Sequence, residues 1–192
     1  MTRPRTGRLR GVLTLLVALI VVGLLSSLPF DLGGVRWYEG RAGEPVDAQA
    51  FRVSVARVGL ARTVQLSSAT VTTDQTYVLV RVRYDIRRRP GGLGEVRLVT
   101  ADGYRYAPLT ATGTYSIAPP PVEPGYTTSG VLVFEVPADK AVGASMEFQN
   151  LVVYTHYRPA ARVLDVVTAS TERAPDDTFE VGPEVASVEV TP

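Results

Sequence analysis

The chain has one histidine, His156, and no cysteine, and these counts set narrow bounds on its chemistry. A Ser-His-Asp triad would have to combine His156 with a serine such as Ser54 or Ser116. Disulfides, thiolate catalysis, thiolate-bound zinc and multi-histidine metal sites are excluded. His156 lies in the segment Tyr154-Thr155-His156-Tyr157, which is typical of a packed or surface position in a strand. We therefore predict no catalytic residue, no metal and no cofactor.

Acidic residues offer two further kinds of chemistry. Glu135 and Glu147 could form an acid–base couple, but the apolar residues beside them indicate that both point outward into solvent. The aspartates available to an oxygen-ligand calcium site are Asp74, Asp102, Asp139 and Asp165. They lack Asp-x-Asp-x-Asp-Gly spacing, and hydrogen bonds to the local backbone explain aspartates in turns. The chain also lacks the glycine-rich motifs of nucleotide-binding loops.

Arginine and tyrosine residues are the candidates for binding a partner. Three adjacent arginines open the loop Arg87-Arg88-Arg89-Pro90-Gly91-Gly92, and Arg81 and Arg83 precede them. Such a cluster can dock an anionic partner, for instance an envelope polymer, a lipid headgroup or an acidic protein; a solvated loop is the alternative. Tyr104 and Tyr106 can belong to an exposed aromatic platform or to the core. The predicted partner-binding residues are Arg81, Arg83, Arg87, Arg88, Arg89, Tyr104 and Tyr106.

The elements that carry these residues are predicted to be strands. Apolar and polar residues alternate most clearly over 76–87, where Val78 and Val80 face one way and Arg81 and Arg83 the other. A slip of the alternation near Arg57 indicates a β-bulge. Ala101-Asp102-Gly103 indicates a hairpin turn. Further strands are expected at 51–60, 96–100, 104–107, 114–117, 130–136, 145–148, 151–157 and 163–167.

This pattern predicts an all-β fold. About seven to nine short strands, separated by prolines and without a helical period, indicate an antiparallel β-sandwich over residues 48–167, with a small barrel as the alternative.

The N-terminal end of the chain predicts a membrane anchor. Residues 1–10 hold four arginines and no acid, and residues 11–30 form an uncharged apolar run long enough to cross a bilayer. Because no small-x-small cleavage site follows, we expect an uncleaved signal anchor; a cleaved signal peptide is the alternative. The positive-inside rule then keeps the leader in the cytoplasm and exports the rest of the chain. The formal charge of +1 accordingly divides into a basic leader and a remainder with 16 basic and 19 acidic groups.

Two segments flank the predicted sandwich. Residues 31–47 are rich in glycine and are expected to be a spacer, in which Trp37 and Tyr38 either rest at the lipid headgroups or pack on the domain. Residues 168–192 are acidic and are expected to be mostly disordered. Val185, Val188 and Val190 leave room there for a weak strand added to a sheet edge.

Several blocks together resemble the bacterial exported-domain family DUF4352. The blocks are Ala42-Gly43-Glu44-Pro45-Val46, the strand 77–84, Asp102-Gly103-Tyr104-Arg105-Tyr106, Glu123-Pro124-Gly125 and Phe134-Glu135-Val136-Pro137. They span residues 42–155, and the chain departs from the family in its Tyr84-Asp85 and its arginine-rich loop. The resemblance implies an immunoglobulin-like sandwich on a membrane-anchored envelope protein, and it implies no enzymatic activity.

The sequence thus predicts a non-catalytic binding or accessory module of the bacterial cell envelope, anchored by a single pass with its domain outside the cytoplasmic membrane. Its expected partner is an envelope protein or an anionic envelope component, and export argues against nucleic acid. One alternative is a structural spacer subunit of a larger membrane complex. The other is a secreted hydrolase that uses His156.

Overall fold

The computed structural model describes residues 34–65, 70–87, 93–109, 124–150, 158–180 and 187–190. The chain divides into two units, Met1–Gly33 and Gly34–Pro192, and all described residues belong to the second. The predicted leader and anchor lie outside them. Within the part that is described, no helix is long and apolar enough to cross a membrane.

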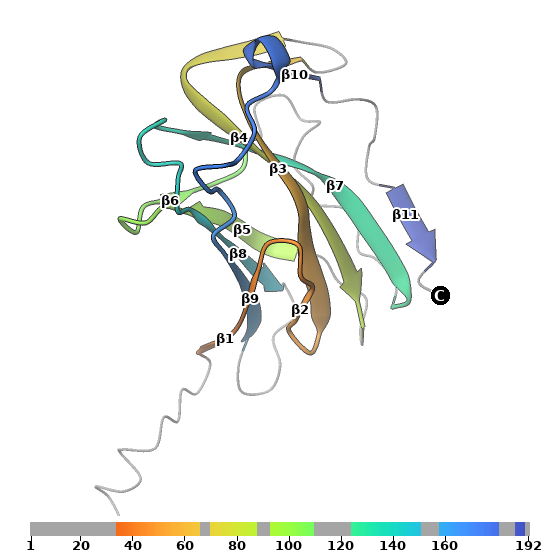
Figure 1. The fold of residues 1–192 in the computed structure, drawn as a ribbon. Helices are drawn as coiled ribbons and strands as arrows, with labels where there is room; N and C mark the ends of the chain where they lie inside the picture. The colour runs from red at the N-terminus through yellow and green to blue at the C-terminus, as the bar shows by residue number, and fades with distance from the viewer. Residues whose placement is uncertain are drawn as a thin grey trace, which may run out of the picture. The chain divides into compact units, whose positions relative to one another are not determined.

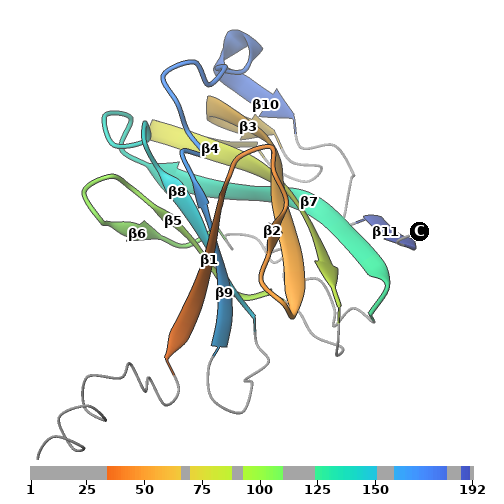
Figure 2. The ribbon, with the colours of Figure 1, turned by 60° about the horizontal axis from the view of Figure 1, so that its bottom comes forward.

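The described residues form two sheets (Figures 1 and 2). The first sheet has the order β1-β9-β8-β5-β6, with β1 at Val35–Arg41, β9 at Arg158–Leu164, β8 at Ser145–Asn150, β5 at Leu93–Val99 and β6 at Arg105–Tyr106. The second has the order β10-β3-β4-β7-β11, with β10 at Thr178–Glu180, β3 at Phe51–Gln65, β4 at Thr70–Ile86, β7 at Tyr126–Val136 and β11 at Ser187–Val190. A two-residue strand, β2 (Val46–Asp47), pairs with the free side of β3 near its start.

One hydrophobic core joins the two sheets and makes the fold a β-sandwich. Val80 and Val82 of β4 and Phe134 of β7 belong to the same buried cluster as Leu98 of β5 and Phe148 of β8. Because both sheets contribute their inward faces to one core, the predicted all-β sandwich is confirmed. The small barrel is not formed by these two sheets.

The clearest sequence signals are confirmed in detail. The inward residues of β4, from Val78 to Ile86, are all buried, as the alternation predicts. The register between β3 and β4 shifts between Val55 and Arg57, where the slip in the sequence indicates a bulge. β5 and β6 pair as a hairpin, and Gly103 has φ +88°, which glycine adopts without a steric penalty. The strands expected at 114–117 and 151–157 lie outside the described residues.

The expected spacer is wrong for residues 35–41 and 46–47, because these residues form β1 and β2. β1 pairs in parallel with β9, so its hydrogen-bonding partner lies more than a hundred residues away along the chain and local composition does not reveal it. Tyr38 packs against the core, and the Arg162 guanidinium lies 4.6 Å from the centre of the Trp37 ring. These contacts favour packing on the domain over the lipid headgroups for both aromatic residues.

The expected disorder of residues 168–192 is wrong for the described part of that segment. A short 3₁₀ helix, η1, spans Pro175–Asp177, and β10 pairs in parallel with β3. β11 pairs antiparallel with the start of β7, so the weak edge strand anticipated from Val188 and Val190 is present. Backbone pairing with long neighbouring strands holds these segments, which compensates for their polar composition.

Candidate functional site

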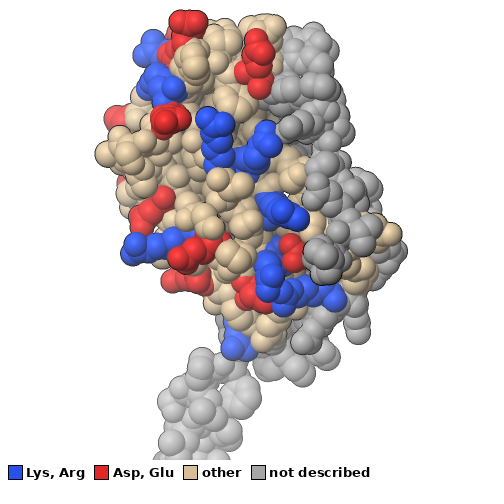
Figure 3. Space-filling model, turned by 45° about the vertical axis from the view of Figure 1, so that its right-hand side comes forward, with Lys and Arg blue, Asp and Glu red and all other residues tan. Residues whose placement is uncertain are grey.

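Three of the predicted arginines lie on or next to β4. Arg81 and Arg83 are exposed on the outward face of the strand, and Arg87 follows its last residue. Arg88 and Arg89 lie outside the described residues. Figure 3, which turns the side of β7 and β11 toward the viewer, shows Lys and Arg side chains gathered in the middle of this face.

Strand pairing adds a further arginine that the sequence analysis missed. Arg57 of β3 lies directly opposite Arg81 in the β3–β4 register, and Ser54 lies opposite Arg83. We call Arg57, Arg81 and Arg83 the arginine face. Like charges directly opposite each other across two strands destabilise a sheet. The slip in alternation near Arg57 was the one signal in the sequence, because the bulge moves Arg57 onto the outward face of β3.

At the end of β4, acidic and basic side chains lie close together. Asp47 Oδ2 lies 2.6 Å from Arg87 Nη1 and 3.6 Å from Arg52 Nη2. Asp85 lies opposite Arg52 in the register. Burial raises the pKa of the Asp85 carboxyl, while the charges of Arg52, Arg87 and Arg83 oppose that rise. Arg87 is therefore part of an ionic network that ties β2, β3 and the end of β4 together.

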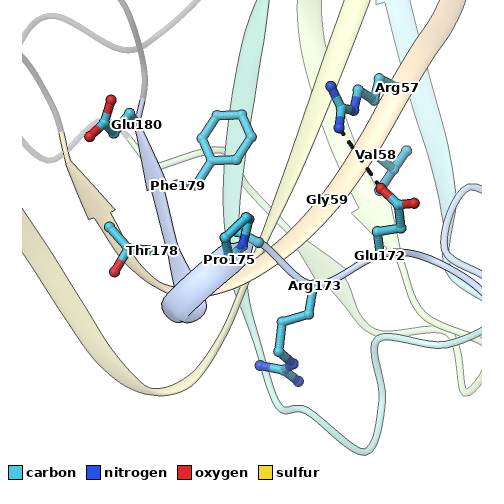
Figure 4. Close-up of a pocket in the computed structure, with 10 residues that line it drawn as sticks. Arg57, Val58, Gly59, Glu172, Arg173, Pro175, Thr178, Phe179 and Glu180 are labelled. Carbon is cyan, nitrogen blue, oxygen red and sulfur yellow. Dashed lines mark ion pairs between the residues drawn. The ribbon is translucent and has the colours of Figure 1, made fainter.

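Arg57 also has an acidic neighbour, from the segment that follows β9. Its Nη2 lies 3.9 Å from Glu172 Oε2, and the two side chains are 76% and 84% exposed (Figure 4). An exposed ion pair at this distance contributes little to stability. It leaves Arg57 available to exchange Glu172 for another anion.

Residues 172–180, which we call the C-terminal strap, run along the edge of β3. Leu60 N donates to Glu172 O at 3.1 Å, and Ala174 N donates to Leu60 O at 2.7 Å. Arg62 N donates to Asp177 Oδ1 at 3.1 Å. These bonds satisfy backbone groups that an edge strand would otherwise expose.

The strap places the Phe179 side chain on the outer face of the second sheet. There Phe179 packs on an apolar cluster that includes Leu79 and Val133 and is separate from the main core. A Cβ built on Gly59 would lie 3.9 Å from Phe179 Cε2, an ordinary van der Waals contact, so the ring lies over β3 close to Gly59.

Two hollows lie beside Phe179. The smaller, about 190 Å³, is lined by Arg57, Glu172 and residues of the strap; Figure 4 shows Arg57 and Glu172 pointing toward each other beside it. The larger, about 350 Å³, lies over β3, β4 and β7, and we call it the outer hollow. Its lining residues are Ala56, Arg57, Gly59, Leu79, Arg81, Val131 and Phe179. It therefore combines two guanidinium groups with an apolar floor.

The predicted tyrosines do not join the arginines. Tyr104 and Tyr106 belong to the β5–β6 hairpin of the first sheet, whereas the arginine face lies on the second. Tyr104 is 61% exposed, and Lys140 Nζ lies 4.3 Å from the centre of its ring. Tyr106 packs partly against the main core. Hydrogen bonds from Lys140 and Thr100 lower the pKa of Asp102 in the hairpin turn. The arginines and these tyrosines are thus two separate surfaces.

The expectation that Glu135 and Glu147 are both solvated outward residues is wrong for Glu147. Its side chain is only 5% exposed, because Arg162 and Arg105 lie over it, with Arg162 Nη2 2.9 Å and Arg105 Nε 3.4 Å from the carboxylate oxygens. Arg162 Nη1 also reaches Glu39 at 2.9 Å. Glu135 lies in the other sheet, where it accepts a hydrogen bond from the Thr73 hydroxyl. The two carboxylates therefore form no acid–base couple.

Two candidates for chemistry remain, the single histidine and a metal site. His156 lies outside the described residues. Among the residues whose positions are described, no group of three or more His, Cys, Asp or Glu side chains could hold a metal ion.

Comparisons with known proteins give likenesses of fold. No family model matches the chain, and a search of curated proteins gives no match. The yjhA protein of Bacillus subtilis aligns with 12% identity and a TM-score of 0.49, over 64% of this chain and 98% of its own. A β-sandwich protein of Clostridium difficile 630 aligns with 14% identity and a TM-score of 0.40, over 66% and 94%. The fold assignment stands on the strand pairing and the shared core of this chain.

Proposed function

We propose that the chain is a single-pass, membrane-anchored module of the bacterial cell envelope, whose extracytoplasmic domain binds an anionic partner and has no catalytic activity. The apolar run 11–30 with its basic flank supports the anchor and its orientation. The two-sheet sandwich supports an immunoglobulin-like domain of the kind that the resemblance to DUF4352 implies.

The observation that carries the binding role is the pairing of Arg57 with Arg81, with Arg83 two residues along the same strand. Local rules of sheet stability disfavour two guanidinium groups at directly opposed positions. Proteins tend to break such rules at functional sites, where the unfavourable arrangement serves a ligand. Guanidinium forks match the geometry of carboxylate and phosphate oxygens, so the fitting partner is an acidic protein surface or an anionic envelope component.

On the outer face of the first sheet, two arginines form ion pairs with carboxylates of the same sheet. Arg162 there bridges Glu39 and Glu147, and Arg97 Nε lies 2.9 Å from Glu95 Oε1. Arg97 and Arg162 therefore already hold carboxylates of their own sheet at short distances. Arg57 holds Glu172 only through an exposed ion pair at 3.9 Å, which another anion can replace.

The test is crosslinking in intact membranes with three forms of the full chain. One is unchanged, one carries Arg57→Ser, Arg81→Ser and Arg83→Ser, and the matched control loses Arg36, Arg97 and Arg158 to serine. All six arginines are in strands of the domain, and the control positions belong to the first sheet. Each charge-assisted hydrogen bond contributes about 1.5–3 kcal/mol, so we expect the arginine-face variant to lose at least about tenfold of the crosslinked partner.

The control variant should keep its crosslinks at the unchanged level. Equal crosslinking by the unchanged chain and the arginine-face variant would remove this face from consideration. That result would favour the alternative in which the domain is a spacer within a larger complex, and deleting residues 48–167 would then alter that complex.

A further inference from the structure

We propose that the outer hollow binds a small, soluble organic phosphate, in which a phosphate monoester is joined to one apolar group about the size of a phenyl ring. This inference goes beyond the proposed function, because it gives the same face a small-molecule ligand in addition to the anionic partner. It adds an apolar requirement that binding by charge alone does not have.

The size and lining of the outer hollow set the size of the ligand. Its volume of about 350 Å³ is near the lower end of the roughly 300–1,000 Å³ that small-molecule sites occupy. Leu79, Val131 and Phe179 supply apolar contact surface within it. A ligand with an apolar group of phenyl size can cover these side chains with that group and place its phosphate at the arginines.

The two arginines select phosphate over carboxylate. Arg57 and Arg81 come from neighbouring strands and lie opposite each other, so their two forks line one hollow. A carboxylate has two oxygens and satisfies one fork in bidentate fashion, whereas a phosphate monoester presents three oxygens and up to two negative charges. A phosphate can therefore accept hydrogen bonds from both guanidinium groups at once, which one carboxylate does only in part.

A larger residue at position 59 can fill the outer hollow without changing the charge of its lining. Gly59 lines both hollows, its φ lies in the ordinary range, and an added Cβ meets only ordinary van der Waals contact. A leucine at this position extends beyond Cβ into space that the ligand needs. Ala56, an exposed residue at the bulge, lines the outer hollow as well and offers an independent way to fill it.

The experiment is isothermal titration calorimetry on the full chain in nanodiscs of phosphatidylcholine. The probes are phenyl phosphate, inorganic phosphate and phenol, which separate the combined ligand from its two halves. We expect phenyl phosphate to bind at least about tenfold more tightly than inorganic phosphate, with phenol weaker still. Gly59→Leu and Ala56→Leu should each reduce that preference to about onefold while leaving binding of inorganic phosphate in place.

Two arginine variants complete the design. Arg81→Gln should weaken both phosphates by about tenfold, because it removes one fork. The matched control, Arg62→Gln, removes an arginine of β3 that pairs with Asp177 outside the outer hollow, and it should leave both affinities unchanged. Circular dichroism of each variant checks that the sandwich is intact.

The inference is overturned if phenyl phosphate binds no more tightly than inorganic phosphate, or if neither leucine variant changes its affinity. Binding of vesicles that contain phosphatidic acid, without binding of phenyl phosphate, would assign the face to a lipid headgroup and also overturn it. Loss of crosslinking in the triple serine variant beside unchanged leucine variants would leave the proposed function standing and remove only the ligand class.

Discussion

Phe179→Ala is the substitution that tests most directly whether the C-terminal strap is an integral part of the domain. The ring packs against the apolar cluster that includes Leu79 and Val133, close to Gly59, and it is partly buried. Complete burial of a phenylalanine side chain stabilises a protein by about 1.5–3 kcal/mol. Because part of the ring is exposed and the vacated space opens into the outer hollow, we expect a loss of about 1–2 kcal/mol. For a domain of this size, that loss lowers the melting temperature by roughly 3–6 °C.

The assay is thermal unfolding of the full chain in nanodiscs, followed by circular dichroism, together with hydrogen exchange. Leu60 N donates to Glu172 O and Ala174 N donates to Leu60 O between β3 and the strap, so the amide hydrogens of Leu60 and Ala174 should exchange faster in the variant. Tyr104→Ala is the matched control, because it removes an aromatic ring that is 61% exposed. It should cost less than about 1 kcal/mol and leave both amides unaffected.

An unchanged melting temperature and unchanged exchange of the Ala174 amide would refute this reasoning. The strap would then be a passive tail that adds nothing to the sandwich. A lower melting temperature with unchanged exchange at Ala174 would refute the part of the reasoning that assigns the anchoring of the strap to Phe179.

Three further predictions follow from the packing. Gly40→Ala should destabilise the domain by about 1–3 kcal/mol in urea unfolding, because the new Cβ lies 2.6 Å from Val46 Cγ2. Gly59→Ala, the control, should be nearly neutral. Equal effects of the two substitutions would contradict the packing around β1. Burial raises the pKa of Tyr84 to about 12 from 10.0, so the contribution of its neutral hydroxyl to the free energy of unfolding should be fully present below pH 10 and be lost as the pH rises toward 12. Tyr84→Phe should flatten that fall in stability. An unchanged pH profile would exclude Tyr84 as its cause. Glu147→Gln should lower the free energy of unfolding by about 2 kcal/mol through loss of its buried ion pairs, and a change below about 0.5 kcal/mol would show that they contribute little.

Local alternation in the sequence was sufficient to predict the strands that form the centre of the sandwich. In β4, Val78 and Val80 pack inward while Arg81 and Arg83 point outward, because a strand presents successive side chains to opposite faces. The hairpin at Gly103 followed from turn chemistry in the same way. Such features depend only on residues that are neighbours in the sequence, so the local order of residues is sufficient to predict them.

Features that depend on distant partners were not predictable. β1 and the strap are held by parallel pairing with β9 and β3, and nothing in their own residues names those partners. The pairing of Arg57 with Arg81 depends on the register that the bulge sets. Glu147 is buried because arginine side chains from β6 and β9 lie over it, a contact that arises only when the sheet is assembled.

Site-specific photocrosslinking in intact membranes tests the central claim most directly. A photoreactive residue at Ser54 lies next to Arg83 in the register, and the same residue at Gln149 lies on a strand of the first sheet as the control. We predict strong crosslinks from position 54 that disappear when Arg57, Arg81 and Arg83 are replaced by glutamine, with few from position 149. Crosslinks of equal strength from both positions, or crosslinks at 54 that survive the arginine substitutions, would contradict the binding role of the arginine face.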